Sequence, residues 1–379
     1  MDAISPLQPS ADGDPEEDEG SGGVKPWDPA KIRITTKNFT LREICSQIAA
    51  GEIDLAPDFQ RAFVWKDLQR TRLVESILLG IPLPAFYFSQ DADGAYQVVD
   101  GVQRLSTISL FMDDRHALDE RDLEYLKIGG QKYSTLDTGL RRRFAGTQIV
   151  VHVIEPQTPD ELKYDIFSRV NTLGSPLSAQ EIRHAMSKPR ARGFLQRLAD
   201  LPSFELATDK FFGSGQTRDN HRMMDRELAL RFCAFQVTPL EEYRQFEKLD
   251  SFLLDFMKRV DGKPARIGPA LSDGQLTDLS VSFDFAMQSA ALILGKNAFR
   301  RTARSRGPIN RALFESQALA LAPHPHHVLA GRKTEVGQAL ANLLDQPEYL
   351  KSVTVSTGGT QQVQQRLEQA RSAVAKALE

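Results

Sequence analysis

The sequence predicts an α+β fold in the first half of the chain, followed by an all-α helical domain. Up to about residue 175, strand-forming runs alternate with patterns typical of helices. From Ser178 onward, apolar residues recur at helical spacing and convincing period-two runs are missing. We therefore expect a disordered leader at residues 1–30, a compact α+β domain at 31–177 and a helical domain at 178–379.

The composition is typical of a soluble protein, with 41% hydrophobic and 26% charged residues in 379. The net charge of -3 hides an asymmetry, because residues 1–24 hold seven acids and no Lys or Arg. A slightly basic body permits nucleic-acid binding without requiring it. With only Cys45 and Cys233, we expect neither a disulfide framework nor a cysteine metal cluster. We predict no signal peptide and no membrane span, and hence a cytoplasmic location.

Two amphipathic helices are predicted near the start of the folded region. In FTLREICSQIAAGEI, Thr40 is the expected N-cap and Gly51 the stop. KDLQRTRLVESILLGIPLP repeats the scheme and ends at Gly80 and Pro82. Its expected inward-facing residues are Leu68, Leu73, Ile77 and Leu78.

Strands follow these helices. AFYF and YQVV flank the turn QDADG and are read as two strands, after which a helix begins beyond Gly101. TQIVVHVIE is a further strand, and Thr158 with Pro159 begins the next helix. Apolar stripes then predict the helices of the second domain: RMMDRELALRFCAFQ, FEKLDSFLLDFMKRV and LSVSFDFAMQSAALIL.

The most informative stretch is AYQVVDGVQRLSTISLF, residues 95–111, where a strand turns into a helix. Unpaired N–H groups and the helix dipole make such a helix start an anion site. Gly101 would let a ligand approach, Arg104 could grip phosphate, and Asp100 could orient Arg104 or hold a metal ion. Gln103 could position the ligand. The alternative is a capped turn with an internal ion pair.

Two further polar groups have similar alternatives. PDFQRAFVW, residues 57–65, is either a ligand loop carrying Gln60 and Arg61 or a loop packed by aromatic side chains. FSRVNTLGSPLSAQEIRHA, residues 167–185, places Arg169 and Asn171 at a helix end before a capping box formed by Ser178 and Glu181. The box itself needs no function, but Arg169, Asn171 and Arg183 could line a ligand cleft at the junction of the two domains.

Basic clusters are candidates for contacts with DNA phosphates, although most such runs are solvated faces. The clusters are Arg141 to Arg143; Lys188, Arg190 and Arg192; and Arg300, Arg301 and Arg304 in FRRTARSRGPINR. HPHH, residues 324–327, is read as a surface loop and not as a metal site. We find no Walker loop, dinucleotide fingerprint, paired-cysteine zinc site or Gly-x-Ser-x-Gly elbow.

Three motifs together resemble, in order and spacing, the ParB/sulfiredoxin-like N-terminal domain of GmrSD-type restriction endonucleases: FQRAFVW, VVDGVQRLSTISLF and FSRVNTLGSPLSAQEIRHA. RMMDRELALRF and RGPINRALFES extend the likeness over about residues 35–375. The family's long members continue into a His-Asn-His nuclease domain, for which we find no candidate. The chain therefore resembles a standalone form whose DNA cleavage belongs to a separate nuclease subunit.

The resemblance implies a site for a nucleoside triphosphate with Mg²⁺, used for hydrolysis that accompanies DNA restriction. The family's Asp-Gly-Gln-Gln-Arg motif reads DGVQR here, with Val102 in place of the first glutamine. The implied catalytic residues are Asp100, which also holds the metal, Gln103 and Arg104. The implied nucleotide-binding residues are Gln60, Arg61, Gly101, Arg104, Arg169 and Asn171.

The predicted function is thus a nucleotide-binding, NTP-hydrolysing subunit of a prokaryotic DNA restriction or anti-phage system. DNA would be contacted by Arg300, Arg301 and Arg304. Two alternatives stay open, namely a switch that binds nucleotide or DNA without turnover, and a metal-dependent DNA nuclease centred on Asp100. The sequence does not predict the oligomeric state.

Overall fold

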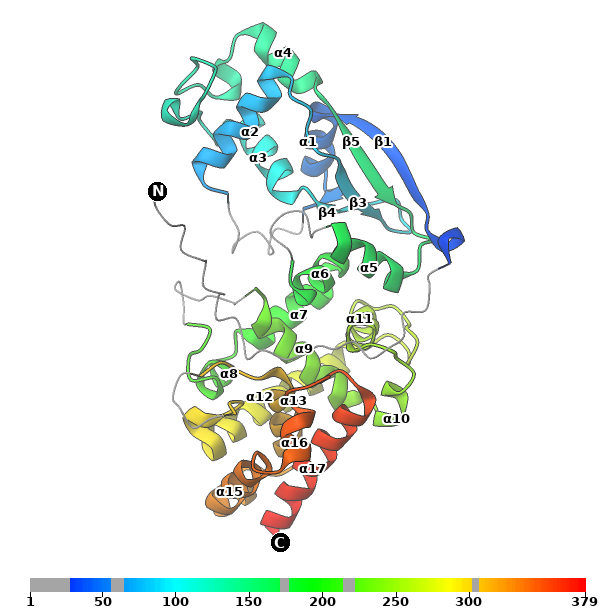
Figure 1. Ribbon diagram of the computed structural model, residues 1–379, viewed down its shortest axis with the longest axis vertical. Helices are drawn as coiled ribbons and strands as arrows, with labels where there is room; N and C mark the ends of the chain where they lie inside the picture. The colour runs from blue at the N-terminus through cyan, green and yellow to red at the C-terminus, as the bar shows by residue number, and fades with distance from the viewer. Residues whose placement is uncertain (1–27, 56–64, 171–176, 214–221, 302–306) are drawn as a thin grey trace, which may run out of the picture. The chain divides into compact units, whose positions relative to one another are not determined.

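The computed structural model describes residues 28–55, 65–170, 177–213, 222–301 and 307–379. The chain forms two compact units, which we call the sheet unit (Lys25–Met186) and the helical unit (Ser187–Glu379). Of the expected leader, residues 1–27 lie outside the described part of the chain. The fold is α+β, with a mixed sheet near the N-terminus and helices after it (Figure 1).

The sheet unit alternates strands and helices along the chain. Its elements are β1 (Ile34–Thr40), α1 (Leu41–Ala49), β2 (Ile53–Asp54), α2 (Asp67–Leu79), β3 (Phe86–Gln90), β4 (Tyr96–Asp100), α3 (Val102–Met112), α4 (Thr138–Gly146), β5 (Gln148–Ile154), α5 (Asp160–Val170) and α6 (Ala179–Met186). The sheet order is β1-β5-β3-β4-β2. β1 pairs with β5 and β3 with β4 in antiparallel fashion, whereas β3–β5 and β2–β4 are parallel.

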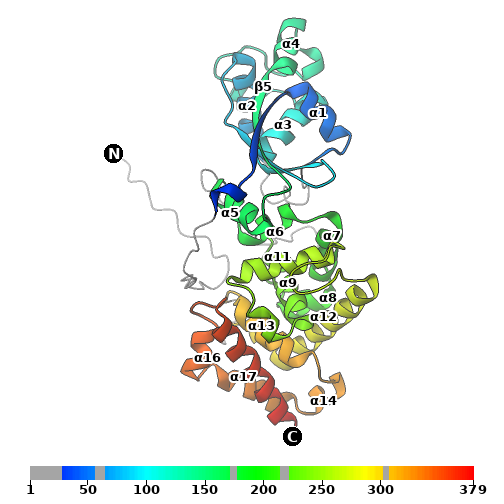
Figure 2. The ribbon, with the colours of Figure 1, turned by 90° about the vertical axis from the view of Figure 1, so that its right-hand side faces the viewer.

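Helices cover both faces of this sheet (Figures 1 and 2). On one face, the apolar sides of α1, α2, α3 and α4 pack on strand residues that include Phe88, Val98 and Val151. On the other face, Val99 and Ile154 pack with Phe167 of α5 and Ile182 of α6. Because α6 completes this second core, the sheet unit extends beyond residue 177, where the sequence placed the end of the first domain.

Local signals explain how several of these helices begin and end. Thr40 and Glu43 form a capping box at the start of α1, and Gly80 ends α2 in the left-handed conformation. Ser178 and Glu181 likewise exchange hydrogen bonds at the start of α6, as the sequence predicted. The prediction was wrong for Leu68, which is 41% exposed on α2.

Strand β1 was not predicted from the sequence. Its first five residues are exposed because it lies at the edge of the sheet, so ITTKNFT shows no apolar alternation. Backbone pairing with β5, from Ile34 opposite Ile154 to Thr40 opposite Gln148, holds it in place.

The helical unit is built around α13, which packs against α9, α12 and α17. Its α-helices are α7 (Pro189–Ala199), α8 (Pro202–Ala207), α9 (Met224–Val237), α10 (Leu240–Tyr243), α11 (Leu249–Val260), α12 (Asp273–Leu294), α13 (Arg311–Leu321), α14 (His326–Gly331), α15 (Lys333–Leu343), α16 (Pro347–Ser352) and α17 (Thr360–Leu378). A buried ionic network crosses its centre: Glu315 of α13 binds Arg231 of α9 and Arg366 of α17.

Candidate functional site

The junction between β4 and α3 is built around Gly101. Its φ of 98° lies in the left-handed region, and a Cβ at this position would stand 2.2 Å from Cδ1 of Phe86. Both facts require glycine. As the N-cap of α3, Gly101 offers no side chain to the first-turn N–H groups, so the positive end of the helix dipole is not capped from within the junction.

The side chain of Arg104, in the first turn of α3, extends toward Asp100 and the segment that leads into β3. Its Nη2 donates to the carboxylate of Asp100 at 2.8 Å and to the carbonyl of Ala85 at 3.3 Å, and its Nη1 donates to the carbonyl of Pro84. The guanidinium carbon lies 4.1 Å from the ring centroid of Phe86. Arg104 thus links the segment that leads into β3 to the end of β4. Its contact with Asp100 is the internal ion pair that the sequence left open as an alternative.

The Asp100–Arg104 pair is only partly withdrawn from solvent. The side chain of Asp100 is 35% exposed and that of Arg104 is 13% exposed. Burial lowers the pKa of the Arg104 guanidinium, and the neighbouring Asp100 carboxylate opposes that effect, so the arginine stays charged. The second oxygen of Asp100 and two N–H groups of Arg104 make no hydrogen bond with any described residue.

Gln103 ties a second segment to the junction. Its side-chain oxygen accepts a hydrogen bond from the backbone N–H of Trp65 at 3.2 Å. Trp65 is the last residue of PDFQRAFVW and packs at the margin of the sheet-unit core. The structure therefore brings the end of that motif to the first turn of α3.

Val102, which replaces the first glutamine of the family's motif, faces inward. It is 7% exposed and packs in the core beneath α3. A valine at this position is compatible with the helix start, and its side chain does not accompany Gln103 and Arg104 at the junction.

The other residues predicted to bind nucleotide are not gathered at the junction by any described contact. Gln60, Arg61 and Asn171 lie outside the described residues. Arg169 is exposed in the last turn of α5, a helix that packs against β4.

The predicted DNA contacts also differ from one another. Arg300 is buried, and its guanidinium donates to the carbonyls of Gly307, Lys296, Ala298 and Thr208. It holds the local chain path and is not placed to reach a phosphate. Arg301 is exposed, and Arg304 lies outside the described part of the chain.

Sequence reasoning missed the partners that position Arg104. The carbonyls of Pro84 and Ala85 carry no sequence signal, since every residue has one. Phe86 looks like an ordinary first residue of an apolar strand. Only the pairing of β3 with β4 brings these groups to α3.

Among the described residues, no three His, Cys, Asp or Glu side chains lie together as a metal cluster. A site for Mg²⁺ at Asp100 would resemble those in which one or two carboxylates act with phosphate oxygens and water. The oxygen of Asp100 that Arg104 leaves unengaged suits that donor set.

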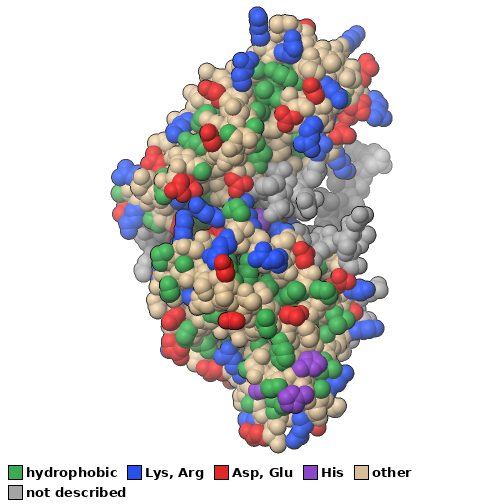
Figure 3. All heavy atoms as spheres, turned by 180° about the vertical axis from the view of Figure 1, so that it is seen from behind, with side chains coloured by type: hydrophobic (Ala, Val, Ile, Leu, Met, Phe, Trp, Pro, Cys, Tyr) green, Lys and Arg blue, Asp and Glu red, His purple; other side chains and the backbone are tan. Residues whose placement is uncertain are grey.

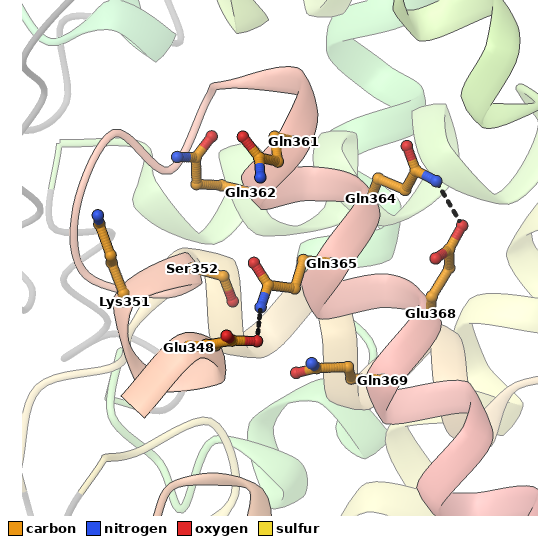
Figure 4. Close-up of a pocket in the computed structure, with 9 residues that line it drawn as sticks. All are labelled: Glu348, Lys351, Ser352, Gln361, Gln362, Gln364, Gln365, Glu368 and Gln369. Carbon is orange, nitrogen blue, oxygen red and sulfur yellow. Dashed lines mark hydrogen bonds between the residues drawn. The ribbon is translucent and has the colours of Figure 1, made fainter. Parts of the chain in front are cut away.

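A polar groove of about 540 Å³ lies elsewhere, between α16 and α17 of the helical unit (Figure 4). Glutamine side chains dominate its wall, and two of them bind acids of the same wall: Gln365 binds Glu348 at 3.4 Å and Gln364 binds Glu368 at 2.8 Å. It contains none of the predicted site residues, and its paired side chains make it a weaker candidate than the β4–α3 junction.

Comparison with known proteins matches residues 41–187 to the model of the GmrSD restriction endonuclease N-terminal domain. This segment runs from the start of α1 to the residue after α6, and it contains the whole β4–α3 junction. No curated protein matches the chain. Within the described part of the chain, no helix is both long and apolar enough to cross a bilayer.

The family match, the α+β architecture and the Asp100–Gly101–Arg104 junction agree with the likeness seen in the sequence. Residues 41–187 thus form a domain similar to the GmrSD restriction endonuclease N-terminal domain, a family that implies a component of a restriction or anti-phage defence system.

Proposed function

We propose that the sheet unit binds a nucleoside triphosphate with Mg²⁺ at the β4–α3 junction and hydrolyses it in support of DNA restriction. The observation that carries this proposal is the uncapped start of α3 beside the partly exposed Asp100–Arg104 pair. Fixed N–H donors and a guanidinium are the groups that stabilise charge developing on a phosphoryl group.

Each junction residue has a distinct part in the proposal. Gly101 keeps a side chain away from the helix start, so the N–H groups of the first turn can approach phosphate oxygens. Arg104 offers the two N–H groups that its carbonyl partners leave unengaged. Asp100 offers its second oxygen to Mg²⁺, which when bound would neutralise phosphate charge.

Gln103 has two parts in this proposal. Its oxygen holds Trp65, while its amide N–H groups remain to orient the ligand or the attacking water. Gln60, Arg61, Arg169 and Asn171 stay proposed ligand contacts on the strength of the motif resemblance.

The test is nucleotide binding and steady-state phosphate release by the purified full chain with Mg²⁺, with and without DNA. Asp100→Asn should lower turnover on the order of 100-fold while leaving the fold intact. Arg104→Lys keeps the charge but loses the planar fork, and a similar loss is expected. Asp113→Asn is the matched control, because Asp113 is exposed at the opposite end of α3.

A non-hydrolysing switch is the second candidate, favoured by the engagement of Gln103 with Trp65. Nucleotide binding by the wild type that Asp100→Asn or Arg104→Lys weakens, with no phosphate release, would select this alternative. If the wild type binds no nucleotide, the junction is a structural turn and the proposal fails. Mg²⁺-dependent DNA nicking lost in Asp100→Asn would instead support a nuclease.

A further inference from the structure

The basic clusters identified in the sequence differ in how far their side chains are bound by other parts of the chain. Arg190 donates to the carbonyls of Val260 and Leu271 and to Asp273, and Arg192 donates to the carbonyl of Ser187. With Arg300 bound to four carbonyls, these arginines hold the helical unit together. They are not available as a docking surface.

The three consecutive arginines of α4 are different. Arg142 and Arg143 are exposed and Arg141 is half-buried. None of the three forms an ion pair with a described residue. The nearest acid in sequence, Asp137, caps α4 by accepting hydrogen bonds from the N–H groups of Gly139 and Leu140.

Several other arginines of the sheet unit, unlike those of α4, form ion pairs with carboxylates. Four of them lie against carboxylates: Arg70 with Asp67, Arg72 with Glu124, Arg104 with Asp100 and Arg121 with Asp119. Other basic residues of this unit, such as Arg33, Arg115 and Lys127, also form no ion pair with a described carboxylate, but within the described part of the unit only α4 carries three arginines in succession. Figure 3 shows Lys and Arg side chains at the end of the unit where Figure 1 places α4.

α4 is held firmly enough to present these charges. Phe144 is fully buried and packs against Phe111 and Tyr133, with ring centroids 5.1 and 6.0 Å apart. Arg143 also donates to the carbonyl of Leu79 at 3.2 Å. The first turn of α1 packs beside the end of α4, where it adds the exposed Arg42.

We propose that α4 and the start of α1 form a docking surface for the sugar-phosphate backbone of duplex DNA. Successive helical residues point about 100° apart, so Arg141, Arg142 and Arg143 cannot enter one groove together. They can reach phosphates on both sides of a groove, and unpaired guanidinium groups are well suited to phosphate oxygens. The contact is thus independent of base sequence. The choice of DNA as the partner rests on the proposed role in restriction.

The test is fluorescence anisotropy with a mixed-sequence DNA duplex and the full chain, over roughly 50 to 200 mM salt. The variant Arg141→Gln/Arg142→Gln should bind at least about tenfold more weakly at the lowest salt. The slope of log affinity against log salt should become shallower by about 1 for each arginine–phosphate interaction that the variant removes. Arg143 is left in place because it also supports the carbonyl of Leu79.

The matched control is Arg72→Gln/Arg121→Gln. It removes the same charge from two exposed arginines of the same unit that are paired with acids. This variant should bind DNA nearly as the wild type does. Equal weakening in both double variants would mean that only the net charge matters, and it would overturn the proposal. Unchanged binding in the α4 variant, or no duplex binding by the wild type, would overturn it as well.

Nucleotide binding and phosphate release measured without DNA separate this inference from the proposed function. Both activities should be unchanged in the α4 variant, because Arg141 and Arg142 lie outside the β4–α3 junction. If duplex binding depends on α4 in a protein that binds no nucleotide, the docking surface stands and the nucleotide site fails. If the α4 variant binds duplex DNA as the wild type does but no longer binds an acidic protein, the partner of α4 is not DNA.

Discussion

Gly101 is the residue on which the geometry of the β4–α3 junction depends. Its positive φ and its closeness to Phe86 both exclude a side chain. The glycine thereby lets Arg104 cross to Asp100 and to the carbonyls of the segment that leads into β3. A single residue thus determines whether strand, helix and arginine can come together.

We predict that Gly101→Ala lowers the free energy of unfolding by about 2 to 4 kcal/mol, because backbone strain and overpacking against Phe86 add. Gly51→Ala is the matched control. Gly51 has a φ of 75° but no atom within 4 Å of an added Cβ, so only the strain of about 1 kcal/mol is expected. Urea unfolding of both variants is the measurement, and equal losses of stability would contradict the close approach to Phe86.

At the scale of elements, α2 is joined to the long connection between α3 and α4 by one buried carboxylate. Glu75 is 3% exposed and accepts hydrogen bonds from the backbone N–H groups of Glu124, Tyr125 and Leu126. Burial would raise the pKa of Glu75, but these N–H groups and Arg72 outweigh it, and the pKa lies below its ordinary value of 4.5. The connection is therefore fastened by a charged group.

This anchor predicts an acid-sensitive contribution to stability. Because the folded-state pKa of Glu75 is lowered, its contribution is complete above pH 4.5 and is lost as the pH falls through the folded-state value. Glu75→Gln should lower the unfolding free energy by about 2 kcal/mol at pH 7, with a smaller difference from wild type at about pH 3. The measurement is urea unfolding at both pH values. Glu52→Gln, an exposed change, should show no such pH dependence.

At the scale of the whole molecule, the sheet unit and the helical unit each have their own core. The helical unit also contains the buried network of Glu315 with Arg231 and Arg366, which the sheet unit does not share. Units with separate cores can unfold separately.

We predict two transitions in differential scanning calorimetry of the full chain. Glu315→Gln should lower one of them by about 10 °C, since breaking a buried ion pair costs about 3 to 5 kcal/mol. Glu75→Gln should lower only the other transition. Glu368→Gln, an exposed change on α17, is the control and should move neither. A single transition shifted by both Glu315→Gln and Glu75→Gln would contradict independent unfolding.

Much of the fold was predictable because its signals are local. Thr40, Gly80 and the Ser178–Glu181 box mark helix ends through hydrogen bonds and backbone angles that involve only near neighbours. Leu68 and β1 show where this fails. Thr71 and Glu75 occupy buried positions of α2 through partners distant in sequence, and β1 is held by pairing with β5.

The sequence by itself determined the α+β class, the helical character of the second half, the motif DGVQR at a strand-to-helix turn and the likeness to the GmrSD family, since these depend on spacing along the chain. Only the tertiary structure decided how the arginines are used. Arg104 and Arg300 bind carbonyls from segments distant in sequence, whereas Arg141 and Arg142 of α4 bind no distant carbonyl and form no ion pair with a described residue. A charged side chain looks the same in sequence in either case, and its partners are set by which segments the fold brings beside it.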